Sequence, residues 1–449
     1  MKRWQSIQSQ IKEVRAYMNS LQLPDSFVNL AKELFVVFSC YGQPYFLVIV
    51  RGLLLCPQRK TITSCIRLGG VKNHFSCVHR FLSQYRWEPK LLALSLANLI
   101  IQKLGIDQLV LVIDDTLVAK WGKKIFGRCL HFDHSAKEND PKYLFGHNWV
   151  VIGLLYYTKT FSKWLCFALW ASLYISKDKC PEERSFQTKI EIALQMLEAI
   201  KGALNLILTV VTDAMYIKAP VIKWAIVNQV TLMGRIRKDS VLYEPAPQRR
   251  RKGRGRPRKY GNRIKDFLGL PFKKATLRLY DKDVELRYHS VRAYYKSAQA
   301  LVQILVVLYP DRIEPTLFLC TDLHQTPEDI LKLIAARFKI EVTFQYLKEQ
   351  GGLTHWQCRK EKAVTRSATL NTCALSLLIL WSLLESNVVQ PELWDYWPWY
   401  RQKDSISIPD MLRQLKAKSI ERTIFTTLSP DKHKVKKIQA LVNTLKLAA

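Results

Sequence analysis

Apolar positions repeat with two different periods along the chain, and the change of period separates helical from β segments. Residues 1 to about 105 place apolar side chains at three- and four-residue steps, as in FVNLAKELFVVF, which predicts helices. The pattern changes at LVLVIDDT (Leu109–Thr116), a β-branched run typical of a buried central strand. Strand and helix patterns alternate after it, so we expect an α/β protein.

Six further segments continue this alternation. In chain order they are the strands Asn148–Tyr157 and Trp164–Ile175, a helix over roughly Glu182–Leu204, the strand Leu204–Asp213, a helix around Ile217–Val227 and the strand Val230–Arg237. The first two are expected to be antiparallel neighbours of the central strand. The predicted order is three strands, helix, strand, helix, strand.

About ninety residues then interrupt the alternation. They begin with the basic run RRRKGRGRPRKYG (Arg249–Gly261) and continue with period-two segments such as Ala275–Val291, which predict β structure with one solvated face. A single helix is expected over Thr326–Gly352, with Thr326 as N-cap and Pro327 at the first helical position. The rest of the chain has a mostly helical pattern.

Charge narrows the class of partner. The chain carries 69 Lys and Arg against 37 Asp and Glu, a formal net charge of +32. A folded protein this basic repels itself unless a polyanion is near, so we expect nucleic acid; solubility charge or an anionic membrane surface are the alternatives. No stretch reaches the ~18 uninterrupted apolar residues that cross a bilayer, so no membrane contact is expected. The ten cysteines form no CxxC pair, which favours a cytosol.

The segment Thr61–Leu82 has two short helical halves joined at Gly69–Gly70. This resembles a helix-turn-helix whose second helix begins near Val71. It would present Lys72, Asn73 and His79 or Arg80 to DNA. A plain helical hairpin with a glycine turn is the alternative reading.

Acidic residues close two of the predicted buried strands. Asp114 and Asp115 end the first strand, and Asp213 ends the fourth. Because the carboxyl ends of neighbouring strands meet at one edge of an open sheet, we expect these carboxylates to lie close together. Such a cluster requires hard divalent cations, Mg²⁺ or Mn²⁺. Two such ions suit in-line phosphoryl displacement.

A third acid, Glu341, lies on the late helix with a cation on either side. At 100° per residue, Glu341 lies about 40° around the helix from Arg337, and Lys348 about 20°. The three side chains therefore share one stripe. A carboxylate between two cations suits a metal ligand beside a phosphate backbone, whereas a solvated helix face is the alternative.

The segments VIDDT, VVTDAMY and RFKIEVTFQYLK together resemble the catalytic core of a DDE transposase from bacterial insertion sequences. The likeness is greatest to the branch with a Tyr-x2-Arg-x3-Glu-x6-Lys signature around the third acid. Arg337, Glu341 and Lys348 match this signature, whereas Ile334 stands in the tyrosine position.

The same resemblance assigns the other two acids. Asp213 matches the second acid of the family. The family pattern of an apolar strand followed by Asp-x-Thr/Ser favours Asp114 as the first acid, with Thr116 in the third place. Asp115 is the rival for that position.

The resemblance implies a ribonuclease H-like core with a β-rich insertion before the Glu-bearing helix. It implies DNA cleavage at transposon ends and strand transfer by a 3′-hydroxyl, at one site where Asp114, Asp213 and Glu341 hold two Mg²⁺ ions, with Mn²⁺ able to substitute. Arg337 and Lys348 would hold DNA phosphates. Pairing of two double-stranded transposon ends implies a homodimer on DNA. The resemblance also implies a location at the nucleoid in a bacterial cytoplasm.

Two other functions would keep the same fold. One is a non-cleaving DNA-binding repressor or domesticated remnant, against which the three intact acids argue. The other is a metal-dependent DNA nuclease of another purpose, against which the insertion and the helix-turn-helix argue, since both favour recognition of specific ends.

The basic run contains a segment that resembles an AT-hook, Arg254-Gly255-Arg256-Pro257. An extended Arg-Gly-Arg fits the narrow minor groove of A·T-rich DNA, and the flanking Arg258 and Lys259 would neutralise phosphates. We expect it to clamp DNA beside the acidic site; an unstructured solvated loop is the alternative.

These shifts in pattern divide the chain into five parts. They are a helical DNA-binding domain (1–105), the first part of the core (106–238), the β-rich insertion with the basic run (239–325), the second part of the core (326–390) and a helical C-terminal region (391–449).

Overall fold

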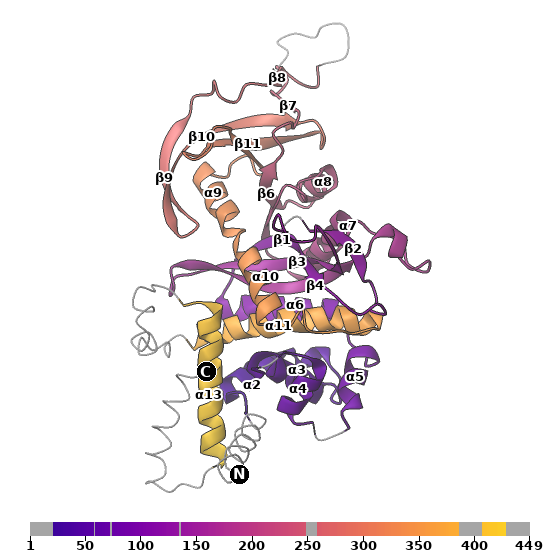
Figure 1. Ribbon diagram of the computed structural model, residues 1–449. Helices are drawn as coiled ribbons and strands as arrows, with labels where there is room; N and C mark the ends of the chain where they lie inside the picture. Colours follow the sequence, from indigo (N-terminus) through magenta and orange to yellow (C-terminus); the bar gives the residue numbers. More distant parts are fainter. Residues whose placement is uncertain are drawn as a thin grey trace.

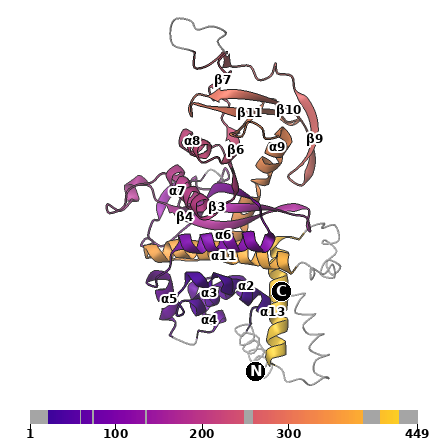
Figure 2. The ribbon, with the colours of Figure 1, turned by 180° about the vertical axis from the view of Figure 1, so that it is seen from behind.

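One mixed β-sheet with helices on both faces forms the centre of the protein (Figures 1 and 2). The computed structural model describes residues 21–57, 59–71, 74–133, 136–247, 258–385 and 406–427. Five strands make the part of the sheet that the sequence predicts: β1 (Gln108–Ala119), β3 (Tyr143–Thr158), β4 (Lys163–Tyr174), β5 (Ile207–Thr212) and β6 (Thr231–Ile236).

The pairing of these strands agrees with the expected order. β3 is antiparallel to both β1 and β4, whereas β1, β5 and β6 are parallel neighbours. Within the five, the order across the sheet is β4-β3-β1-β5-β6. For these five strands the predicted order of three strands, helix, strand, helix, strand is confirmed. β1 is the central strand of these five, and most of its β-branched side chains are buried, on both faces of the sheet.

Two groups of strands extend this sheet. A short edge strand that the sequence analysis did not predict, β2 (Cys129–Phe132), pairs with the start of β3. On the other side β12 (Thr316–Cys320) pairs with β6, followed by β11 (Ala300–Leu308) and β10 (Lys282–Tyr295). β9 (Lys273–Leu279) also pairs with β10. The stretch expected as an insertion therefore continues the core sheet.

Helices from distant parts of the chain cover the two faces. α6 (Pro89–Leu104), α11 (Glu361–Leu384) and α10 (Lys339–Glu349) pack against β4, and α6 and α11 lie side by side across the sheet (Figure 1). α7 (Lys189–Ala203) packs against β3, and α8 (Ala219–Val227) against β6. α7 begins later than predicted, because Thr188 and Glu191 form a capping box that fixes its first turn.

The N-terminal helices form a bundle below α11 (Figure 1). They are α2 (Asp25–Lys32), the 3₁₀ helix Glu33–Val37, α3 (Gln43–Leu55), α4 (Ile62–Gly69) and α5 (Ser76–Ser83). The predicted start of the second helix near Val71 is wrong. Gly70 ends α4 with φ +61°, and α5 begins at Ser76, whose backbone N–H donates to His74 Nδ1 at 3.3 Å.

Two long helices follow α10 in the described part of the chain. α11 is long and apolar enough to cross a membrane by length and composition alone, but 94% of its most apolar window is buried inside the protein. Burial to this extent is typical of a helix in the core of a protein. α13 (Ile408–Thr427) packs against α11. The Trp-rich segment at 394–400 lies outside the described residues.

A buried histidine in β3 makes the fold sensitive to acid. Burial, with the charge of Lys120 nearby, lowers the pKa of His147 from 6.5 to about 3, and Nε2 hydrogen-bonds with Phe126 O at 2.9 Å. The unfolded chain binds this proton near its ordinary pKa and the folded protein does not, so stability is lost as pH falls from 6.5 towards 3.

We therefore expect His147→Gln to reduce the acid sensitivity. Between about pH 7 and about pH 5, wild type should lose on the order of 2 kcal/mol more of its unfolding free energy than the variant. Glutamine keeps a side-chain N–H for Phe126 but does not titrate. Urea unfolding at both pH values checks this; the same pH dependence in both proteins would contradict it.

Candidate active site

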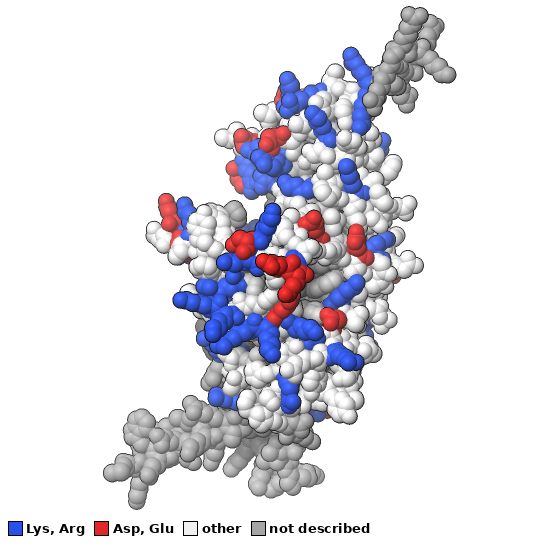
Figure 3. All heavy atoms as spheres, turned by 90° about the vertical axis from the view of Figure 1, so that its right-hand side faces the viewer, with Lys and Arg blue, Asp and Glu red and all other residues white. Residues whose placement is uncertain are grey.

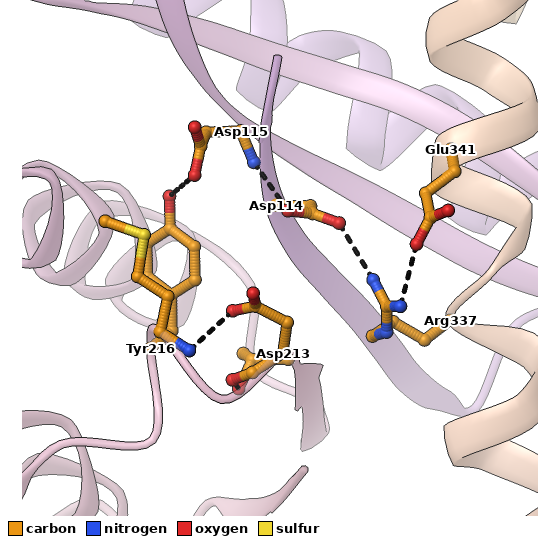
Figure 4. A network of polar contacts seen from close by, with 8 residues as sticks. Asp114, Asp115, Asp213, Tyr216, Arg337 and Glu341 are labelled. Carbon is orange, nitrogen blue, oxygen red and sulfur yellow. Dashed lines mark hydrogen bonds and ion pairs between the residues drawn. The ribbon is translucent and has the colours of Figure 1, made fainter. Parts of the chain in front are cut away.

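The two neighbouring acids of β1 point to opposite faces of the sheet (Figure 4). Asp114 Oδ2 accepts from Arg337 Nη1 at 2.8 Å, on the face covered by α10. Asp115 Oδ2 accepts from Lys189 Nζ at 2.6 Å, and its Oδ1 accepts from the Tyr216 hydroxyl at 3.3 Å, on the face covered by α7. The sequence left Asp114 and Asp115 as rivals; in the structure only Asp114 faces Arg337.

Asp213 follows β5, the parallel neighbour of β1, as predicted. Its Oδ1 accepts from the backbone N–H of Met215 at 2.9 Å, which fixes the turn after the strand. Tyr216, fully buried, lies under this turn and links it to Asp115. Lys189 and Tyr216 were missed by the sequence analysis, because nothing local marks a lysine or tyrosine as a partner of a strand end.

The Glu-bearing helix is broken into two. The prediction of one helix over Thr326–Gly352 is wrong, since α9 (Pro327–Ala336) ends just before Arg337 and α10 begins at Lys339. The Thr326 N-cap is confirmed, with Oγ1 accepting from Asp329 N at 3.2 Å.

Contacts from the tip of the β9–β10 hairpin hold this break. The Tyr280 ring lies 6.3 Å from that of Phe338, and Lys339 Nζ lies 2.7 Å from Asp281 Oδ2. Tyr280 and Asp281 are far from the helix in sequence, so helical periodicity could not have indicated the break.

Arg337 and Glu341 still share a side, as predicted from their spacing. Arg337 Nη2 donates to Glu341 Oε1 at 2.7 Å while Nη1 contacts Asp114 (Figure 4). One guanidinium therefore bridges acids from β1 and α10. Burial alone would lower the pKa of Arg337, but Asp114 and Glu341 raise it.

The electrostatics of the site favour a cation among these acids. Burial, together with neighbouring Asp213 and Asp115, raises the pKa of Asp114 to about 7 even though Arg337 opposes the shift. Burial also raises the pKa of Asp213. Keeping buried, neighbouring carboxylates ionised costs free energy, and a nearby cation offsets this cost.

The residues fit divalent metal ions by their chemistry. Among the described residues, no three Asp, Glu, His or Cys side chains lie close enough to bind one ion as they are placed here. Instead, the guanidinium of Arg337 lies between Asp114 and Glu341, so a positive charge already occupies this position. Carboxylate oxygens are the ligands that Mg²⁺ and Mn²⁺ prefer.

A cavity of about 790 Å³ opens beside Asp213 and Arg337. Tyr280 and Tyr309 line it, with Arg235 and Arg312 among its cations. It lies between β5, the α9–α10 junction and the hairpin of β9 and β10, so the stretch predicted as an insertion forms one wall of the site.

The remaining predicted DNA contacts lie in different places. Lys348 is half-buried on α10, where burial lowers its pKa and Asp133 opposes the shift. Arg80 is exposed on α5. Lys72 lies outside the described residues. On one face of the molecule Lys and Arg surround a group of acidic side chains near its middle (Figure 3).

The basic run was predicted to lie beside the acids, but most of it, residues 249–257, lies outside the described residues. The described strands that precede and follow it in the chain, β7 (Leu242–Tyr243) and β8 (Arg263–Ile264), pair with each other beyond β10 at the far end of the sheet (Figure 1). Six strand spacings separate β8 from β5, roughly 30 Å. Local pattern cannot reveal this, because strand order depends on pairing between distant segments.

Only part of the run is described. Arg254 and Arg256 lie outside the described residues. Arg258 and Lys259 are exposed, and Lys259 Nζ donates to Gln299 Oε1 at 3.0 Å.

Comparison with known proteins places the chain in a family. A family model described as DDE superfamily endonuclease matches residues 38–294, more than half of the chain, including Asp114 and Asp213. The search of curated proteins found no match. The strand order around β1 is that of the ribonuclease H-like core expected of such enzymes, which generally use divalent metal ions and act on DNA. The chain belongs to the DDE superfamily of endonucleases.

Proposed function

We propose that the protein is a transposase that binds transposon ends and catalyses metal-dependent DNA cleavage and strand transfer. One observation carries the proposal: acids from β1 and α10 meet at Arg337, and Asp213 from β5 lies beside them. The proposed catalytic acids are Asp114, Asp213 and Glu341. The alternative first acid, Asp115, is already engaged by Lys189 on the other face.

The three acids would hold two Mg²⁺ ions, or Mn²⁺ in their place. Bound ions would supply a nucleophile at neutral pH and neutralise charge on the phosphate. The protein's own part is to fix these acids on rigid elements: Asp114 on a central strand, Asp213 in a turn held by Met215 N, and Glu341 on a helix.

Cations near the acids would position DNA. Arg337 lies next to two of the acids, where a phosphate of the DNA strand would approach them. Lys348 lies further along α10. Arg80, with Lys72, would contact duplex DNA, as would four residues of the basic run, Arg254, Arg256, Arg258 and Lys259. We also propose a homodimer on DNA and a location at the bacterial nucleoid in the cytoplasm.

The proposal predicts metal-dependent cleavage of the ends of the protein's own transposon, called the element ends below. Purified protein with labelled DNA carrying those ends and Mg²⁺ should release the end and join it to a target plasmid. Asp213→Ala should lower cleavage about a thousandfold while leaving DNA binding intact. The exposed acid Glu198 on α7 supplies a matched control, and Glu198→Ala should cleave like wild type.

Other outcomes separate the alternatives. Tight binding of the ends without cleavage by wild type would favour a repressor. Cleavage of any DNA without joining would favour a nuclease of another purpose. Cleavage that survives in Asp213→Ala would reject the assigned site.

A further inference from the structure

We propose that the β2–β3 hairpin binds the unpaired bases of a DNA strand that passes the acids. The proposal rests on the proposed function, since it concerns the strand that these acids would cut. It names a surface that neither the family match nor the sequence motifs assign.

The hairpin exposes an unusual group of large apolar side chains. Leu130 pairs across the ladder with Phe145, and Phe132 with Tyr143. The four side chains are 50%, 48%, 46% and 62% exposed, respectively, in the order just given. The rings of Phe132 and Tyr143 lie 5.4 Å apart, edge to face. Exposed contiguous aromatic side chains mark a binding surface.

This surface lies on the same face of the sheet as Asp114. Residues paired across an antiparallel ladder share a face, as do residues two apart along a strand. Asp114 pairs with Val151 of β3, and Phe145 lies six residues before Val151 on that strand. The patch therefore begins about 20 Å from Asp114 along the sheet.

One pair of hydrogen bonds shows that this face is the one that α10 covers, and an electrostatic effect agrees with it. The Lys120 side chain, on the Asp114 face, donates to the carbonyls of Leu353 and Trp356, which follow α10. Asp133, at the end of β2, is close enough to Lys348 of α10 to affect its pKa. The patch therefore extends the surface on which Glu341 and Lys348 of α10 lie.

The charges beside the patch suit a polyanion. Arg128 stacks over the Phe145 ring at 4.1 Å and is fixed by donating from Nε to Lys120 O at 2.8 Å. Lys142, next to Tyr143 in the chain, is exposed, as are Lys123 and Lys124 between β1 and β2, and Trp121 is 78% exposed just after β1. The segment from Lys120 to Phe145 contains six Lys or Arg residues and three Asp or Glu residues.

These charges favour DNA over a second copy of the chain. β2 is an edge strand, so a second copy pairing there is the competing occupant. Two copies would bring the same excess of cations together, whereas a DNA strand neutralises it. Aromatic faces between cations are the means by which proteins hold unpaired bases, and bases within a duplex do not offer their faces.

A binding experiment on the full chain tests this. The probes are a labelled blunt duplex and the same duplex with a single-stranded extension, measured by fluorescence anisotropy at one salt concentration without divalent metal. Wild type should bind the extended probe more tightly, by roughly tenfold per stacked base. Tyr143→Leu and Trp121→Ala should reduce that advantage, whereas Tyr143→Phe keeps the ring and should retain it. Tyr41→Leu, at another exposed tyrosine, is the matched control.

The possible results are distinct. If Tyr143→Leu prefers the extended probe over the blunt duplex as strongly as wild type does, the inference is overturned while the proposed function stands. Loss of self-association in Tyr143→Leu, measured by sedimentation, with equal weakening on both probes, would assign the surface to a second copy. Absence of any DNA binding by wild type would instead count against the proposed function.

Discussion

Asp114→Asn is expected to lower DNA cleavage about a thousandfold, about 4 kcal/mol of transition-state stabilisation. Asparagine keeps the size of the side chain and can still accept a hydrogen bond from Arg337, so the fold and DNA binding should persist. What is removed is the negative charge on the face shared with Glu341. Single-turnover cleavage of labelled element ends measures the effect.

Asp115→Asn is the matched control, one residue away on the same strand. Its carboxylate meets Lys189 and Tyr216 on the opposite face. The variant leaves the partly buried Lys189 without its ion pair, so we expect a loss of about 1–2 kcal/mol in unfolding free energy. Cleavage should stay within about tenfold of wild type. Equal loss of cleavage in both variants would contradict the separation of the two acids by face.

Arg366→Ala should cause the largest loss of stability, about 4 kcal/mol. Arg366 is 2% exposed in α11, and its guanidinium donates to the carbonyls of Phe81, Leu82, Tyr85 and Trp87. It also lies over the Trp87 ring at 4.7 Å. The side chain therefore caps the end of α5 and ties the N-terminal bundle to the core.

The size of this loss follows from what truncation leaves behind. Several buried carbonyls would lose their donor, and the Trp87 ring would face a cavity. Arg366→Lys should recover only part of the stability, because an ammonium cannot reproduce the planar fork of donors. Lys362→Ala, at an exposed position on the same helix, should change stability by less than about 0.5 kcal/mol. Urea unfolding measures all three; a midpoint for Arg366→Ala equal to that of Lys362→Ala would refute the role.

Local pattern was enough to predict the core of the fold. The β-branched runs at Leu109–Thr116 and Leu204–Asp213, separated by helical periods, predicted the strands that carry the first two acids, because burial on both faces selects such residues. The four-residue spacing of Arg337 and Glu341 likewise predicted their contact.

What local pattern missed depends on contacts between distant segments. Whether Asp114 or Asp115 faces the third acid depends on which helix covers which face of β1. The break before Lys339 depends on the β9–β10 hairpin, and the position of β7 and β8 depends on the order of the outer strands. The role of Arg366 was also invisible, since a single arginine in an apolar helix shows no partner in sequence.

The central claim is that Asp114 binds a catalytic metal ion and Asp115 does not. Cleavage by Asp114→Cys and Asp115→Cys, each measured in Mg²⁺ and in Mn²⁺, tests it most directly, because a thiolate is a poor ligand for Mg²⁺ and a better one for Mn²⁺. We expect Asp114→Cys to be inactive in Mg²⁺ and to regain cleavage in Mn²⁺, while Asp115→Cys shows the same ratio between the two metals as wild type. A metal-specific rescue of Asp115→Cys, with none for Asp114→Cys, would contradict the account.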